Sequence, residues 1–141
     1  MARSDYLQRK FGSPDASAIY ARVTAAARAV GLNPDFDRIA RQPNTLRAHA
    51  LIAASGAVGE AAQARMVETL FEAYFLEGAD LTARAVLAAL GTRAGLSEAR
   101  VAAALDDDAA AADAEQADAQ ARSLGVGGVP LFVIDGRLGV S

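Results

Sequence analysis

The fold is decided by a short stretch near the end of the chain, Gly127-Gly128-Val129-Pro130-Leu131-Phe132-Val133-Ile134-Asp135-Gly136-Arg137-Leu138. Proline has no backbone N–H, so Pro130 suits the first position of a strand and not its middle. The Asp135-Gly136 pair separates two apolar runs and predicts a tight turn. The stretch therefore predicts an antiparallel hairpin of Leu131–Ile134 and Leu138–Val140.

Outward from the hairpin, the rest of the chain is rich in alanine and carries the start and stop signals of successive helices. Ser, Asn and Thr stand where helices begin, and glycines stand where they end. The link Leu32–Pro43 contains two prolines and an extended Phe36–Ile39, a candidate short strand. The predicted helices cover Asp5–Phe11, Pro14–Val30, Leu46–Ser55, Gly59–Glu77, Thr82–Arg93, a segment that follows Ser97, and a last segment that ends at Gly125.

The apolar residues of these helices recur at helical spacing, which predicts the faces that they bury. The predicted apolar face of the second helix consists of Ile19, Val23, Ala26 and Val30. That of the longest helix consists of Met66, Val67, Leu70, Phe71, Tyr74 and Phe75. The last helix has a small-residue face of Ala110, Ala114, Ala117, Ala121 and Leu124.

The hairpin and the helices together predict a mostly α fold with an incomplete sheet. Leu131–Ile134 is apolar without interruption, as in a strand that is covered on both faces. Such a strand needs a larger sheet, and the sequence contains no convincing partner strand. Unpaired strand edges recruit other chains, so formation of a homo-oligomer is one expectation.

Composition excludes several function classes. The chain has 141 residues, 52% of them hydrophobic and 22% charged, which indicates a globular domain. A net charge of −3 without a basic block argues against nucleic-acid binding. No residue is a cysteine and one is a histidine, so thiol catalysis and a multi-histidine metal site are not expected from this chain alone. No apolar run is long enough to span a membrane, and the polar start predicts a cytoplasmic location.

Four segments together resemble the FrnE-like members of the DsbA family. The first is Asp5–Gly12, similar to the first helix after that family's amino-terminal strands. The second is Pro43-Asn44-Thr45-Leu46-Arg47-Ala48-His49, similar to an Asn-Thr…Ala-His segment. The third is Glu68–Gly78, similar to a Leu-Phe-x-Ala-Tyr-Phe-x-Glu-Gly segment. The fourth is Gly125–Phe132, similar to the family's cis-proline loop.

The resemblance implies a thioredoxin-like α/β fold interrupted by a helical insertion. Residues 1–124 would form the insertion, and residues 125–141 a partial thioredoxin-like segment with the cis-proline loop and the hairpin. It also implies thiol–disulfide exchange with a peptide or glutathione. The family's Cys-x-x-Cys has no counterpart here and would lie before Met1, so no catalytic residue is expected in this chain.

Two alternatives remain open. The chain resembles the same part of a glutathione-dependent 2-hydroxychromene-2-carboxylate isomerase or kappa-class glutathione transferase. A non-enzymatic helical binding module is the other alternative. No metal or cofactor is expected, with glutathione as the one exception under the first alternative.

The candidate binding residues are Val129, Pro130, Asn44 and His49. The resemblance implies that the Val129–Pro130 bond is cis and that the Val129 backbone pairs with an extended thiol substrate. Asn44 is expected to cap a helix, and the glutathione-using relatives imply that it contacts ligand as well. His49 is either an ordinary surface histidine or a group that tunes a nearby thiol.

Overall fold

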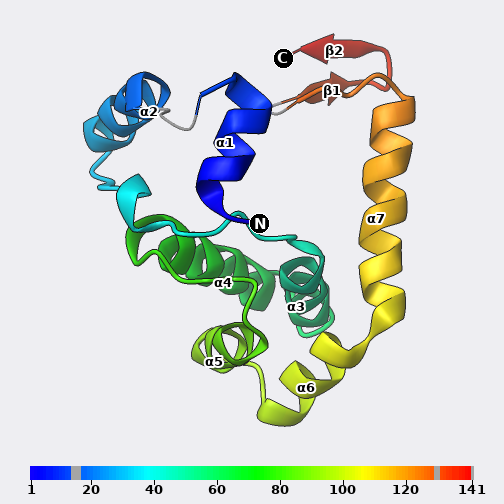
Figure 1. Ribbon diagram of the computed structural model, residues 1–141. Coiled ribbons are helices and arrows are strands. Elements are labelled where there is room, and N and C mark those ends of the chain that lie inside the picture. The colour runs from blue at the N-terminus through cyan, green and yellow to red at the C-terminus, as the bar shows by residue number, and fades with distance from the viewer. Residues whose placement is uncertain (14–16, 129–130, 141) are drawn as a thin grey trace.

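The computed structural model describes residues 1–13, 17–128 and 131–140, which form helices and one small hairpin (Figure 1). The prediction of a mostly α fold with an incomplete sheet is confirmed. In chain order, the elements are α1 (Arg3–Phe11), α2 (Ser17–Ala29), the 3₁₀ turn η1 (Phe36–Arg38), α3 (Leu46–Gly56), α4 (Glu60–Phe71), the π-helical turn η2 (Glu72–Leu76), α5 (Arg84–Arg93), α6 (Glu98–Asp106), α7 (Asp108–Ser123), β1 (Phe132–Ile134) and β2 (Leu138–Val140).

Helix α3 lies at the centre of the packed part of the molecule. It contacts α4, α5, α6 and α7, and α5 packs in turn on α4 and α6. Leu51 of α3 is fully buried, as are Met66 of α4 and Leu87 of α5. Burial of such side chains removes apolar area from water and is the main stabilising contribution of this core.

Close packing in this core depends on Gly91 of α5. A Cβ atom at Gly91 would lie 2.7 Å from Cγ2 of Val101 and 3.3 Å from Cδ2 of Leu51. The missing side chain lets α5 approach α3 and α6 closely. The three helices therefore form one interlocked unit.

Several predicted helix ends are confirmed by their hydrogen bonds. Gly12 is left-handed, with φ of 73°, and its N–H donates to the carbonyl of Gln8. The Ser97 hydroxyl accepts from the N–H of Arg100 and begins α6. The Asp107 carboxylate accepts from the N–H groups of Ala109 and Ala110 and begins α7. These side chains satisfy backbone donors that have no partner within the helix.

Other predicted boundaries are wrong by a few residues. Helix α1 begins at Arg3 and not at Asp5, because the N–H of Arg3 is already held by the carbonyl of Ala40 at 3.1 Å. Helix α5 begins at Arg84 and not at Thr82, because Asp80 Oδ1 accepts from both the N–H and the hydroxyl of Thr82. The predicted first residues of the second helix fall in 14–16, outside the described residues.

Two predicted elements differ in type from those that the structure shows. Phe36–Arg38 is a 3₁₀ turn and not a strand, since its carbonyl at Phe36 bonds locally to the N–H of Ile39. The predicted single helix Gly59–Glu77 divides into α4 and a π-helical turn from Glu72 to Leu76.

The predicted apolar face of α2 is also wrong. Its partly buried positions are Tyr20, Thr24 and Ala27, one residue beyond the predicted stripe. Val23 is 47% exposed and Val30 is 74% exposed. The side chain of Ile19 lies outside the described residues. One position along a helix is a rotation of about 100°, so α2 meets the molecule through an aromatic ring, not through its valines.

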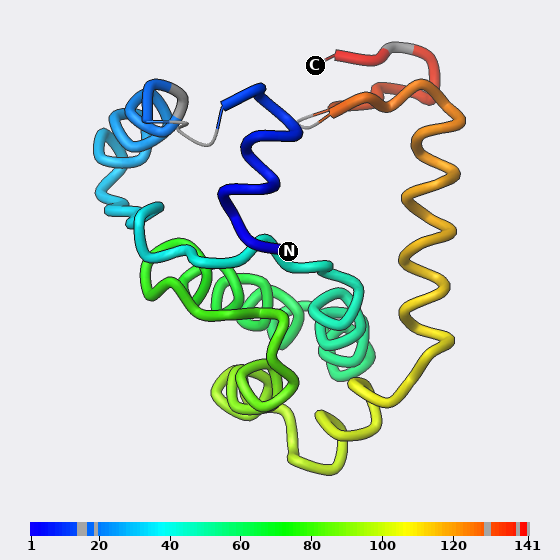
Figure 2. The backbone as a smooth tube through the Cα atoms, in the orientation of Figure 1, coloured from blue at the N-terminus to red at the C-terminus, as the bar shows by residue number. Residues whose placement is uncertain are grey.

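Helix α7 runs from α6, at one side of the packed helices, up to the hairpin (Figure 2). It packs on α3, with Ala110, Ala111 and Ala114 half-buried. Beyond them the predicted small-residue face is largely exposed, and Leu124 is 78% exposed. Helix α7 therefore carries the hairpin away from the main core.

The hairpin forms as predicted in its described part. Phe132 pairs with Val140, and Ile134 with Leu138. Asp135 and Gly136 have φ of 51° and 65°, the left-handed geometry of a tight hairpin turn. Phe132, Val133 and Ile134 are 63%, 64% and 51% exposed, so within the described residues neither face of β1 is covered.

Within residues 1–13, 17–128 and 131–140, no helix is long and apolar enough to cross a membrane.

Gly78 provides a test of the packing that holds the link before α3. It has φ of 71°, and an added Cβ would lie 2.8 Å from the carbonyl oxygen of Arg38. Gly78→Ala should lower the free energy of unfolding by about 2–4 kcal/mol, from left-handed strain plus overpacking. Gly12→Ala is the matched control, since Gly12 has φ of 73° and no other described residue packs within 4 Å of the added Cβ.

Denaturant unfolding measures both variants. Gly12→Ala should cost only about 1 kcal/mol, from backbone strain alone. Equal losses in the two variants would contradict the close approach of η1 to the end of η2.

Candidate functional site

The segment before α3 is tied to the start of the chain. The N–H of Gln42 donates to the carbonyl of Met1 at 3.1 Å, and Ala2 forms an isolated β-bridge with Arg41. The Arg41 side chain lies 3.9 Å from the Asp80 carboxylate. Hydrogen bonds from Thr82 lower the pKa of Asp80, and Arg41 adds to this effect. These contacts fix the position from which α3 begins.

Asn44 lies two residues before α3, and His49 lies in the first turn of that helix. Asn44 Oδ1 accepts from the N–H of Leu46 at 3.0 Å, the capping role that the sequence predicts. Its amide NH₂ retains donors that a ligand could use. The N–H of His49 donates to the carbonyl of Thr45, and the His49 side chain is exposed. Both candidate residues are thus exposed near the start of α3, and Asn44 has a structural role as well.

Val129 and Pro130 lie outside the described residues, so the structure does not place them beside Asn44 and His49. The described residues on either side define how the chain reaches them. Gly125 has φ of 84° and ends α7, and Gly127 and Gly128 are exposed. Leu131 is half-buried directly before β1. The geometry of the Val129–Pro130 bond stays a prediction.

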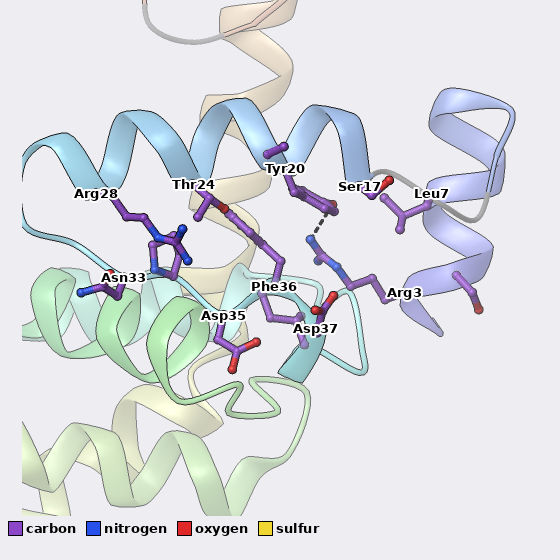
Figure 3. Close-up of a pocket in the computed structure, with 14 residues that line it drawn as sticks. Arg3, Leu7, Ser17, Tyr20, Thr24, Arg28, Asn33, Asp35, Phe36 and Asp37 are labelled. Atoms are coloured by element: carbon purple, nitrogen blue, oxygen red, sulfur yellow. Dashed lines mark hydrogen bonds between the residues drawn. The ribbon is translucent and has the colours of Figure 1, made fainter.

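A second group of residues, which the sequence did not single out, gathers around Arg3. Figure 3 shows the Arg3 side chain reaching from α1 to the hydroxyl of Tyr20 on α2, 2.6 Å from Nη2. Arg3 Nη1 donates to Tyr74 Oη and to Gln42 Oε1, each at 3.2 Å. One guanidinium therefore joins α1, α2, the segment before α3 and η2.

Aromatic rings continue from this group into η2. The rings of Tyr20 and Phe36 stack with centroids 4.4 Å apart. Phe75 meets Phe36 and Tyr74 edge to face, at 6.1 Å and 4.9 Å between centroids. Phe71, predicted as core, is 60% exposed, and its ring centroid lies 5.9 Å from that of Phe75. Tyr74 is buried, as predicted.

The end of η2 is hydrogen-bonded to the link that precedes α3. The carbonyl of Phe75 accepts from the N–H of Asp35 at 2.8 Å. This bond holds the link that carries Phe36 against η2. A single-turn π-bulge often marks a functional position in a helix.

Two hollows flank the Arg3 group and share Arg3, Tyr20, Pro34 and Phe36. One, of about 650 Å³, is lined with polar groups that include Arg28, Asp35 and Asp37 (Figure 3). The other is an apolar cleft of about 740 Å³ between α1, α2, α4 and η2. Its size is in the range of small-molecule sites.

No signal in the sequence marks this cleft. Arg3 precedes the predicted start of the first helix, and its partner Tyr74 is 71 positions away in the chain. Contacts of this kind arise only when helices pack. Within the described residues, no group of three or more His, Asp or Glu side chains is placed to hold a metal ion.

The described part of the chain is a mostly helical domain with one small hairpin after α7. The sequence matches the family model of the DSBA-like thioredoxin domain over residues 8–141. The chain belongs to this family. No curated protein matches the sequence.

Among solved structures, the chain is similar to a probable DsbA oxidoreductase from Streptomyces coelicolor. The two share 30% sequence identity, with a TM-score of 0.81. The match covers 100% of this chain and 61% of that chain. The present chain thus spans about three fifths of the length of that protein.

Burial of Tyr74 provides a pH-dependent test of the Arg3 group. Burial raises the pKa of the Tyr74 phenol above its ordinary 10.0, although Arg3 opposes the shift. A raised pKa favours the neutral phenol in the folded state, so this contribution to stability is complete below about pH 10 and is lost as the pH rises through the folded pKa. The free energy of unfolding should fall more steeply between pH 10 and 12 in the parent than in Tyr74→Phe.

If the free energy of unfolding fell equally with pH in the parent and in Tyr74→Phe, the burial of the Tyr74 phenol would be refuted.

Proposed function

We propose that this chain supplies the helical part and the substrate-binding loop of a FrnE-like thiol–disulfide oxidoreductase of the DsbA family. The main support is the continuous family match over residues 8–141, which includes both the helices and the Val129–Pro130 loop. The name of the Streptomyces coelicolor neighbour favours an oxidoreductase over the glutathione-using relatives. In this proposal, residues 1–124 form the helical insertion and residues 125–141 the partial thioredoxin-like segment.

Thiol–disulfide exchange requires a thiolate that attacks a disulfide sulfur and expels the other sulfur as a thiolate. The chain has no cysteine, so the attacking sulfur must come from residues outside these 141. The role of this chain is then to bind and orient the disulfide, with a peptide or glutathione as the thiol partner. A cytoplasmic location is part of the same hypothesis.

Each candidate residue has a distinct part in this proposal. Pro130 has a fixed φ and no N–H, so it leaves the Val129 backbone free to pair with an extended substrate. Asn44 contributes its amide NH₂ at the start of α3. His49 is exposed and can supply or accept a proton near the reacting sulfur. In this proposal, the Val129–Pro130 loop, Asn44 and His49 all contact the same substrate.

The source of the nucleophile can be tested with a chimera. Those segments of the Streptomyces coelicolor protein that lie outside the match are joined to this chain. Reduction of insulin is then followed by turbidity, with dithiothreitol as the electron source. The chain alone should give no turnover above the dithiothreitol background, and the chimera should accelerate the reaction. Turnover by the pure chain alone would contradict the assigned division of roles.

The substrate-binding loop is tested in the same chimera with Pro130→Ala. Alanine restores an N–H and frees φ, so the backbone edge of the loop is no longer preorganised. Insulin reduction should fall about tenfold or more, which corresponds to about 1.4 kcal/mol of lost transition-state stabilisation. Pro34→Ala, in the link before η1, should change the rate less than twofold. Equal rates for Pro130→Ala and the unchanged chimera would exclude a role for this loop.

A further inference from the structure

The apolar cleft is the feature of the molecule that thiol–disulfide exchange leaves unexplained. It lies between α1 and α2 on one side and α4 and η2 on the other. Ala27 and Leu32 form part of the wall on the α2 side, and Phe71 and Phe75 part of the wall on the other. Phe11, Leu32 and Phe71 are 44%, 53% and 60% exposed, so the cleft leaves a large apolar area in contact with water.

Arg3 lines this cleft and is a half-buried cation that has no anionic partner among the described residues. Its three described hydrogen bonds go to two phenols and one amide, all of them neutral. None of the ion pairs among the described residues involves Arg3. Those bonds use three of the five N–H donors of a guanidinium. A charge that is partly removed from water gains stability from a counterion.

The other charged groups around the cleft do not neutralise Arg3. Glu68 and Glu72 belong to the opposite wall and are exposed, so water hydrates their carboxylates. Lys10 is a second cation of the α1 wall, where its Nζ lies 5.5 Å from the centroid of the Phe11 ring. Asp35 and Asp37 line the neighbouring polar hollow instead. An anion is therefore favoured in the apolar cleft over the polar hollow.

We propose that the apolar cleft binds a small amphipathic monoanion, an alkyl chain of medium length that ends in a carboxylate. The carboxylate meets Arg3, and the chain lies along the apolar walls toward Phe11 and Leu32. This binding is independent of the proposed exchange reaction, because it uses neither the loop at Val129–Pro130 nor a thiol.

A flexible alkyl chain fits these walls better than a planar aromatic ligand does. The rings of Tyr20, Phe36 and Phe75 already contact one another, so their faces are largely occupied. What remains is an irregular surface of ring edges and aliphatic groups. A chain with several rotatable bonds can follow such a surface and bury apolar area at each methylene.

The test titrates the unmodified chain with three probes of one chain length: octanoate, octan-1-ol and octylammonium. Calorimetry gives the affinities, and amide NMR shifts locate the site. Octanoate should bind one to one, about tenfold or more tightly than octan-1-ol, since a charge-assisted bond to Arg3 is lost with the alcohol. Octylammonium should bind more weakly still. Amide shifts should concentrate in α1, α2 and η2.

Two glutamate substitutions on the same helix give a matched pair. Val23→Glu places a carboxylate in the wall of the cleft, at a residue that is 47% exposed and tolerates a polar group. It should weaken octanoate binding at least tenfold. Val30→Glu is the control, at a residue that is 74% exposed and not part of the cleft, and should change affinity less than twofold.

A third variant, Arg3→Gln, removes the cation and should bring octanoate to the affinity of octan-1-ol. Circular dichroism confirms that each variant keeps its helices. Equal affinities of the parent for octanoate and octan-1-ol would overturn the proposal. So would an equal effect of the two glutamates, or amide shifts confined to the exposed hairpin.

Discussion

The arrangement of the outer part of this molecule depends on the guanidinium of Arg3. Its hydrogen bonds reach α2, the segment before α3 and η2, which are far apart in the sequence. The backbone N–H of the same residue donates to Ala40. Helices α1 and α2 share few contacts with the core, so these bonds and the stacking of Tyr20 on Phe36 hold them against it. Both hollows lie beside this side chain.

The molecule combines a closely packed centre with more open parts. Around α3, side chains such as Leu51 and Met66 are fully buried, and Gly91 permits a close approach between helices. The hairpin, in contrast, exposes Phe132 and Val133. Stability therefore comes chiefly from the centre, while the surfaces with binding potential lie outside it. This division is common, because functional segments are usually the less densely packed ones.

The local chemistry of the chain was enough to predict its helices and its turn. Gly12, Ser97 and Asp135-Gly136 act through bonds to near neighbours, so their effect is visible in the sequence. The buried face of α2 was not predictable, since it is set by the stacking of Tyr20 on Phe36. The cleft was missed for the same reason, because its walls meet only through long-range packing. The bond from the N–H of Leu46 to Asn44 is also local, so the capping role of Asn44 was predictable.

The π-helical turn has a consequence for how this fold tolerates changes of length. Such a turn holds one residue more than the α-helical turn it replaces. Loss of a single residue between Glu72 and Leu76 would leave a regular α-helix in this place. The chain beyond would rotate by about 100°, and the Phe75 carbonyl would no longer face Asp35. A related chain one residue shorter at this point would have to pack α5 differently on α3 and α4.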